Sequence, residues 1–201
     1  MPFLFKRLVL FLSITAAFAA DKEANAFHPD AAARYPHHQT NAQVTIGADP
    51  YITEEKSKVA FGKVNPYQLG ILPVLVVIQN DSNKSIRLDR IQAVYNGPQG
   101  DKVEATPARD VRYVRGPNQP KVVPNPIPTA GPKIGKGGKN PLNAWEIEGR
   151  AFAAKMLPAG QTASGFFYFQ SGLQRGATLY LTGLVDAASD QELFYYEIPL
   201  E

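Results

Sequence analysis

The chain is patterned in short apolar runs separated by turn signals. The strongest run, residues 71–79 with the sequence ILPVLVVIQ, is apolar at nearly every position and rich in β-branched side chains. A strand of this kind lies in the centre of a sheet or is covered on both faces. We therefore predict a central strand at residues 71–79, followed by a turn at residues 80–83.

Shorter runs predict further strands around this one. The sequence NGPQGD at residues 96–101 indicates a hairpin loop that returns through residues 102–105. The aromatic run at residues 166–169 places alternate rings on opposite faces of a strand, so one pair belongs to the core. We expect a helix around Trp145 to cover the other pair; the alternative is an exposed patch that includes Tyr180 and Tyr195. The other predicted strands are residues 43–46, 86–88, 91–95, 162–169, 178–185 and 192–200, the last with Phe194, Tyr196 and Ile198 on one face.

Two helices are predicted. Thr53 is placed to cap a short helix at residues 54–60, which begins with two acidic residues and ends at Gly62. Residues 142–157 have helical spacing of apolar positions, although Gly149 weakens that pattern. The apolar positions of this second helix are Leu142, Trp145, Phe152 and Met156.

Many short strands, hairpin-length turns and few helices predict a mainly β fold. The 16 Gly and 17 Pro among 201 residues also argue against a helical bundle. The order of elements is not strand–helix–strand, so a doubly wound fold is not expected. We predict an immunoglobulin-like antiparallel β-sandwich with one or two short helices and a long loop rich in Pro, Gly and Lys.

The first twenty residues have the features of an export signal. Lys6 and Arg7 precede an apolar stretch at residues 8–18, and residues 17–19 read Ala-Phe-Ala, which predicts cleavage after Ala19 or Ala20. The apolar stretch is shorter than the roughly 20 residues that span a bilayer. We therefore expect an exported protein, periplasmic or secreted, with no stable membrane span after signal cleavage.

The remaining chain divides into a tail and one domain. Residues 21–42 lack a periodic apolar pattern and are interpreted as a flexible tail, and residues 43–201 as the folded domain. Within that domain, residues 116–141 form a long loop in which 12 of 26 residues are Gly or Pro, four are Lys and none is acidic. A loop of this length in a compact domain is functional or disordered.

Charge is distributed unevenly after the signal is removed. The whole chain carries a formal +3, but two of the basic residues belong to the signal, which leaves about +1. Residues 84–139 hold 11 Lys and Arg against 4 Asp and Glu, whereas residues 140–201 hold 3 against 7. A basic middle segment of this kind favours an anionic partner.

Candidate catalytic and metal-binding motifs are weak. The chain has no Cys, which excludes disulfides and thiolate chemistry. Its three histidines, His28, His37 and His38, all lie in the predicted tail, so the predicted domain lacks the base that a Ser-His-Asp triad needs. Residues 131–139 resemble a phosphate loop only superficially, because the spacing is short and Gly follows the lysine. No cofactor is predicted.

Two alternatives stay open. Carboxylate pairs permit an enzyme that acts on envelope polymer, although most candidate aspartates fall in predicted turns; they are Asp81, Asp89, Asp101, Asp110, Asp186 and Asp190. The tail histidines permit a metal-binding protein.

The patterns FGKVNPYQLGILPVLVVIQNDS (residues 61–82), GFFYF and the terminal ELFYYEIPL make residues 43–201 similar to small exported bacterial proteins of unassigned function with an immunoglobulin-like fold. This resemblance implies the fold and export. It implies no functional residue.

The main hypothesis is a non-catalytic, exported cell-envelope domain that binds a protein or an anionic envelope component. Nucleic acid is not an expected partner, because no aromatic residues interleave with the lysines. The expected binding surface is basic and consists of Arg109, Arg112, Arg115, Lys121, Lys133, Lys136 and Lys139.

Overall fold

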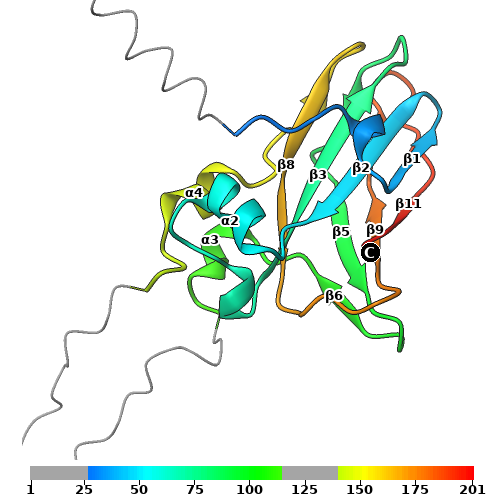
Figure 1. Cartoon of the computed structure of the whole chain (residues 1–201). Coiled ribbons are helices and arrows are strands. Elements are labelled where there is room, and N and C mark those ends of the chain that lie inside the picture. Colours follow the sequence, from blue (N-terminus) through cyan, green and yellow to red (C-terminus); the bar gives the residue numbers. More distant parts are fainter. Residues whose placement is uncertain (1–26, 115–139) are drawn as a thin grey trace, which may run out of the picture.

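A computed structural model describes residues 27–114 and 140–201 (Figure 1). The predicted signal peptide and nearly all of the basic loop lie outside these residues. The described part consists of two large antiparallel sheets packed face to face and a layer of short helices on the outer face of one of them. The structure confirms the predicted mainly β sandwich; the immunoglobulin-like type stays a prediction.

The first large sheet, which the helices cover, is antiparallel with the strand order β1-β2-β3-β8. β3 is central, as its sequence predicts, and pairs with β2 from Val74 to Asn80 and with β8 from Leu72 to Gln79. The strands of this sheet are β1 (His38–Asn41), β2 (Val44–Pro50), β3 (Leu72–Asn80) and β8 (Thr162–Phe169).

The second large sheet has the order β11-β9-β5-β6 and packs behind the first (Figure 1). β5 and β6 form the predicted hairpin around residues 96–101. Its strands are β5 (Gln92–Asn96), β6 (Lys102–Glu104), β9 (Thr178–Thr182) and β11 (Tyr196–Pro199). A third, small sheet joins β10 (Val185–Asp186), β4 (Ile86–Arg87) and β7 (Met156–Leu157).

The two faces of β3 divide the molecule into two cores. Its even-numbered positions, such as Val74 and Val76, pack between the two sheets, whereas Leu75 and Val77 pack against the helices. All four of these side chains are buried. Double coverage explains why the strand is apolar at both alternating sets of positions.

The helical layer completes the second core. Ala60 and Phe61 of α2 and Ile147 of α4 are buried against Phe166 and Tyr168 of β8. The Tyr168 hydroxyl donates a hydrogen bond of 2.7 Å to the carbonyl of Ile147. The helical elements are η1 (Ala32–Arg34), α2 (Glu54–Phe61), η2 (Tyr67–Leu69), α3 (Ala108–Val111) and α4 (Trp145–Gly149).

The helix at residues 54–61 forms as predicted. The Thr53 side chain accepts a hydrogen bond from the amide of Lys56, and the chain leaves the helix through Gly62 at φ +65°. A positive φ of this size favours glycine. The predicted covering of one aromatic pair in β8 is also confirmed, through α4 and the other helices of this layer.

Five predictions about elements are wrong. The strand predicted at residues 43–46 continues to Pro50, and the one predicted at residues 178–185 is divided into β9 and β10, which belong to different sheets. The folded part begins before residue 43, because Ala32 is fully buried and residues 38–41 pair with β2. The helix predicted at residues 142–157 is limited to residues 145–149, because the chain then turns to run along β8, and Trp145 is 72% exposed.

Phe194, predicted to share the core face of the last strand, lies before β11 and is 79% exposed.

The two sheets are joined along the side where β1 and β11 meet. The buried Tyr196 hydroxyl lies 3.2 Å from the Asn41 carbonyl and 3.3 Å from the Val44 carbonyl, to which it donates. Burial raises the pKa of Tyr196 to about 12. On the opposite side, residues of β8, of β5 and of the segment at the end of β6 line a cavity; we call this the open side.

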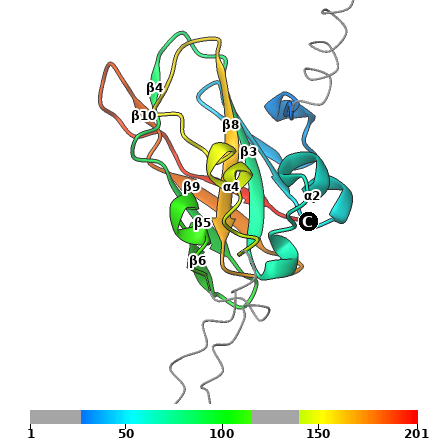
Figure 2. The same cartoon turned by 90° about the vertical axis from the view of Figure 1, so that its left-hand side faces the viewer.

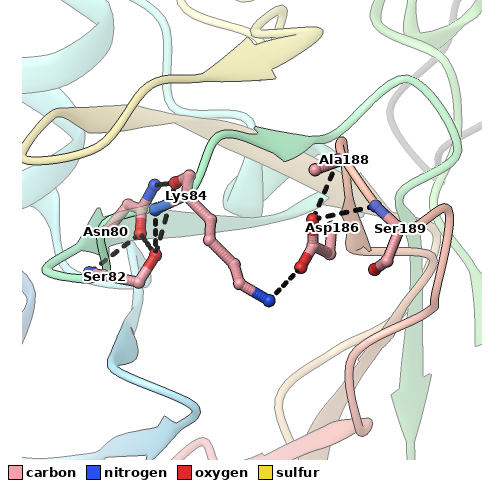
Figure 3. Close-up of polar contacts among 6 residues, drawn as sticks. All are labelled: Asn80, Ser82, Lys84, Asp186, Ala188 and Ser189. Atoms are coloured by element: carbon pink, nitrogen blue, oxygen red, sulfur yellow. Dashed lines mark hydrogen bonds and ion pairs between the residues drawn. The ribbon is translucent and has the colours of Figure 1, made fainter.

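A cluster of polar residues attaches the small sheet to the end of β3 (Figure 3). The Asn80 side-chain amide donates to the carbonyls of Lys84, Leu157 and Pro158, while its oxygen accepts from Ser82. Asn80 is fully buried, so these bonds replace the water that the amide loses on folding.

Lys84 extends this cluster to Asp186 in β10. The Lys84 ammonium lies 2.6 Å from the Asp186 carboxylate, which also accepts from the amides of Ala188 and Ser189. These contacts, the bond from Lys84 first, lower the pKa of Asp186 from its ordinary value of 3.8 to about 2.

The lowered pKa predicts a pH dependence of stability. Because the folded-state pKa lies below the unfolded value, the contribution of Asp186 is complete above about pH 4 and is lost as the pH falls toward 2. Denaturant unfolding between pH 6 and pH 2, at pH values spaced by about one unit, is expected to show this loss in the wild type and less of it in Asp186→Asn. Asp30→Asn, at an exposed carboxylate, serves as the control. Equal pH profiles for the wild type and Asp186→Asn would contradict the assignment.

Candidate functional site

A cavity of about 340 Å³ opens on the open side of the sandwich. This volume falls in the range of ligand-binding pockets, roughly 300–1,000 Å³. We call it the edge groove. It is lined by residues 91–94 of β5 and its approach, residues 104–108 from the last residue of β6 onward, residues 151 and 152, and residues 166–168 of β8.

Two chain segments that pair with the outer edge of β8 frame the edge groove. Phe166 donates to the carbonyl of Arg150 at 2.9 Å and accepts from the amide of Phe152 at 3.0 Å. Further along β8, the amide of Thr106 donates to the carbonyl of Tyr168 at 2.7 Å. The groove lies between these attachments, so its walls are fixed by backbone hydrogen bonds.

Gly165 allows the first of these segments to approach. A Cβ atom at this position would overlap the backbone of Phe152 and Ala151. The close approach brings the Phe152 ring onto the Phe167 ring, with centroids 5.2 Å apart and planes at 17°. The stacked pair forms an aromatic wall of the edge groove, since both residues line it.

The lining is mostly apolar and weakly charged. Four alanines, Ala93, Ala105, Ala108 and Ala151, leave space between the aromatic wall and β5. The polar lining side chains are Gln92, Glu104, Thr106 and Tyr168, of which Tyr168 has its hydroxyl bonded to Ile147. Burial raises the pKa of Tyr168 above its ordinary value. Such a lining suits an apolar ligand with few polar groups better than proton transfer.

Sequence reasoning did not find the edge groove. The groove joins residues from four separate parts of the chain, and its space comes from small residues that carry no motif. The signals present in the sequence are the aromatic run at residues 166–169 and the glycine that precedes it. Neither signal reveals which segment crosses that glycine.

The structure describes two of the predicted basic site residues, Arg109 and Arg112, and separates their roles. Arg109 follows the groove-lining Ala108 in α3, and its side chain is 79% exposed. Arg112 instead donates to Asn143 at 3.0 Å and pairs with Glu148, so it joins α3 to α4. Its charge is therefore balanced inside the molecule.

The remaining predicted site residues lie outside the described residues: Arg115, Lys121, Lys133, Lys136 and Lys139. The described residues that precede and follow these positions in the chain lie close together, because the Asn140 side chain donates a hydrogen bond of 2.6 Å to the carbonyl of Arg112. Two exposed aromatic residues, Tyr113 and Trp145, lie in the chain on either side of it. A basic contact surface made by these residues stays a prediction.

The metal alternative gains no geometric support from the described residues, and Glu104 is the one carboxylate that lines the edge groove. In residues 27–114 and 140–201, no three His, Asp or Glu side chains are grouped so that they could hold a metal ion. His38, one of the predicted ligands, has its Nδ1 2.8 Å from the carbonyl of Tyr35.

No helix within the described parts of the chain is long and apolar enough to cross a membrane.

Comparisons with known proteins identify no family. No protein-family model matches the chain, and no curated protein matches it. Among solved structures, the chain is similar to the yjhA protein from Bacillus subtilis, with 10% identity, a TM-score of 0.40, and coverage of 83% of this chain and 98% of that one. It is also similar to a functionally unknown protein from Listeria monocytogenes EGD-e, with 14% identity, a TM-score of 0.33 and 82% coverage of both chains. These scores are too low to carry an argument about function.

The different positions of Arg109 and Arg112 predict different effects on stability. Arg112→Ala removes the links from α3 to Asn143 and Glu148 and is expected to lower the free energy of unfolding by about 1 kcal/mol. Arg109→Ala, at an exposed side chain, is the matched control and is expected to change it by less than about 0.5 kcal/mol. Urea unfolding of both variants checks this. Equal losses would show that Arg112 is not a structural link.

Proposed function

We propose that the protein is an exported, non-catalytic domain of the cell envelope that binds a partner protein. The edge groove is the contact site, and the partner supplies a short apolar segment. The observation that carries the proposal is the groove itself: a cavity of about 340 Å³ on the open side of the sandwich, lined mostly by apolar residues and by one charged residue, Glu104.

The shape and position of the edge groove support a peptide-like occupant. The groove lies beside the edge of β8, where the protein's own backbone segments already pair at residues 150–152 and 106. Because these segments already occupy that edge, a partner segment would be held by side chains anchored in the groove rather than by strand addition. The stacked rings of Phe152 and Phe167 offer such an anchor an aromatic surface.

A basic residue directly follows one of the groove-lining residues in the chain. Arg109 follows groove-lining Ala108 and is largely exposed. A partner segment that carries an acidic residue beside its apolar anchor would complement this charge. Rim charges of this kind affect the rate of association more than the affinity.

The binding site can be tested by filling the groove. Ala105→Leu adds apolar volume among the lining residues and is expected to leave folding intact while it weakens peptide binding at least about tenfold, since it occupies the anchor position. Ala33→Leu, the same change at an exposed position of η1, is the matched control. Peptides selected from a random twelve-residue phage library against the wild type are measured on all three proteins by isothermal titration calorimetry.

The selected peptides are expected to share apolar anchor residues and to bind the wild type and Ala33→Leu equally. Two results would overturn the proposal: no enrichment of peptides, or peptides that bind Ala105→Leu as well as the wild type. Circular dichroism and the thermal midpoint of Ala105→Leu establish that the variant is folded.

Export is tested separately. The protein recovered from the producing cell is expected to begin at Ala20 or Asp21, because cleavage after Ala19 or Ala20 follows from the small residues at positions 17–20. Amino-terminal sequencing of the envelope and medium fractions measures this. A protein that begins at Met1 and stays in the cytoplasmic fraction would contradict export and leave the groove assignment unaffected.

A further inference from the structure

The outer face of the second sheet is a second candidate surface, which adjoins the edge groove at Gln92, Val94 and Glu104. The inward residues of β9, Leu179 and Leu181, are fully buried, so Tyr180 between them points outward. None of the outward residues on the four strands of this sheet is buried. The helices of the described chain lie on the other sheet (Figures 1 and 2).

Two tyrosines form an aromatic platform on this face. The rings of Tyr180 and Tyr195 have centroids 5.2 Å apart and planes inclined at 32°. Tyr195 is 51% exposed. Val94 of β5 is the strand partner of Tyr180 and extends the apolar area by one side chain.

Hydrogen-bonding side chains surround the platform. Across the strands, the register places hydroxyl and amide groups in rows on both sides of Tyr180; they belong to Gln92 and Thr182 on one side and to Asn96 and Thr178 on the other. Within the described residues, the Asn96 Oδ1 atom is buried and has no hydrogen-bond partner. Because this atom is buried, the groups that this face offers to a ligand are the other hydroxyl and amide groups of the two rows.

The charges on the face exclude some classes of ligand. Glu104 and Glu197 flank Val94 and Tyr180 in one cross-strand row, while Lys102 is the basic residue of the outward positions. The excess of carboxylate repels phosphate and other anionic groups. The apolar area on this face consists of two tyrosine rings and one valine, which is small for the core of a protein–protein interface.

We propose that this face binds a neutral glycan chain. A β-1,4-linked chain of glucose or N-acetylglucosamine presents flat apolar ring faces, which stack on tyrosines, and hydroxyl or amide groups along its edges. The two tyrosine rings stack on the faces of the sugar rings. The rows of Thr, Asn and Gln side chains form hydrogen bonds with the polar groups along the edges of the glycan. The surface thus assigns the protein a carbohydrate ligand in addition to its partner protein.

The test uses cellohexaose and chitohexaose as probes, with the mature full-length protein. Calorimetric titration into the millimolar range is expected to detect binding of at least one of them. Tyr195→Ala and Tyr180→Ala are expected to weaken that binding about tenfold or more, as the loss of a central aromatic contact does. Tyr195→Phe retains the ring and is expected to bind nearly as the wild type does.

Two controls separate this surface from the others. Tyr113→Ala removes a tyrosine that is 74% exposed on the helical layer and is expected to leave glycan binding unchanged. Ala105→Leu fills the edge groove and is expected to leave it unchanged too, so that failure here and failure of the groove proposal are distinguishable.

Three results would overturn the glycan proposal. They are the absence of binding of both hexasaccharides, unchanged binding by a folded Tyr195→Ala variant, and an equal loss in Tyr113→Ala. Tyr195 lies outside the strands and is largely exposed, so its variant is expected to fold even if Tyr180→Ala does not.

Discussion

Burial of β3 on both faces is the constraint on which the rest of the molecule depends. One set of its side chains requires the second sheet and the other requires a layer of helices, because neither set can face water without loss of stability. The short helices contribute to the second core through a few residues such as Phe61 and Ile147. Helices this short are stabilised by such packing rather than by their own propensity.

The same arrangement leaves the two sides of the sandwich unequal. Tyr196 and its hydrogen bonds to β1 and β2 connect the sheets on one side, while β8 and β6 meet near Thr106 on the other. The edge groove lies beside this contact, and Gly165 lets the segment at Phe152 approach β8 and form part of the groove wall. The candidate binding site is therefore a consequence of how the sheets end, not of a motif.

The sequence predicts the central strands well because these strands have periodic signals of their own. β3, β8 and the β5–β6 hairpin lie within a residue or two of their predicted bounds. The failures are at places where distant contacts decide. Residues 38–41 become a strand because β2 offers an edge, and residues 150–152 leave the helical path because β8 accepts their backbone hydrogen bonds. The basic site was predicted from charge alone, which gave no sign that Glu148 balances Arg112.

The central claim is that the open side of the sandwich holds a binding groove, and methyl NMR tests it most directly. Four alanines line the groove: Ala93, Ala105, Ala108 and Ala151. In protein labelled with ¹³C at alanine methyl groups, addition of a library-selected peptide is expected to shift these four signals and to leave those of the exposed Ala33 and Ala188 in place. Shifts confined to alanines outside the groove would contradict the account.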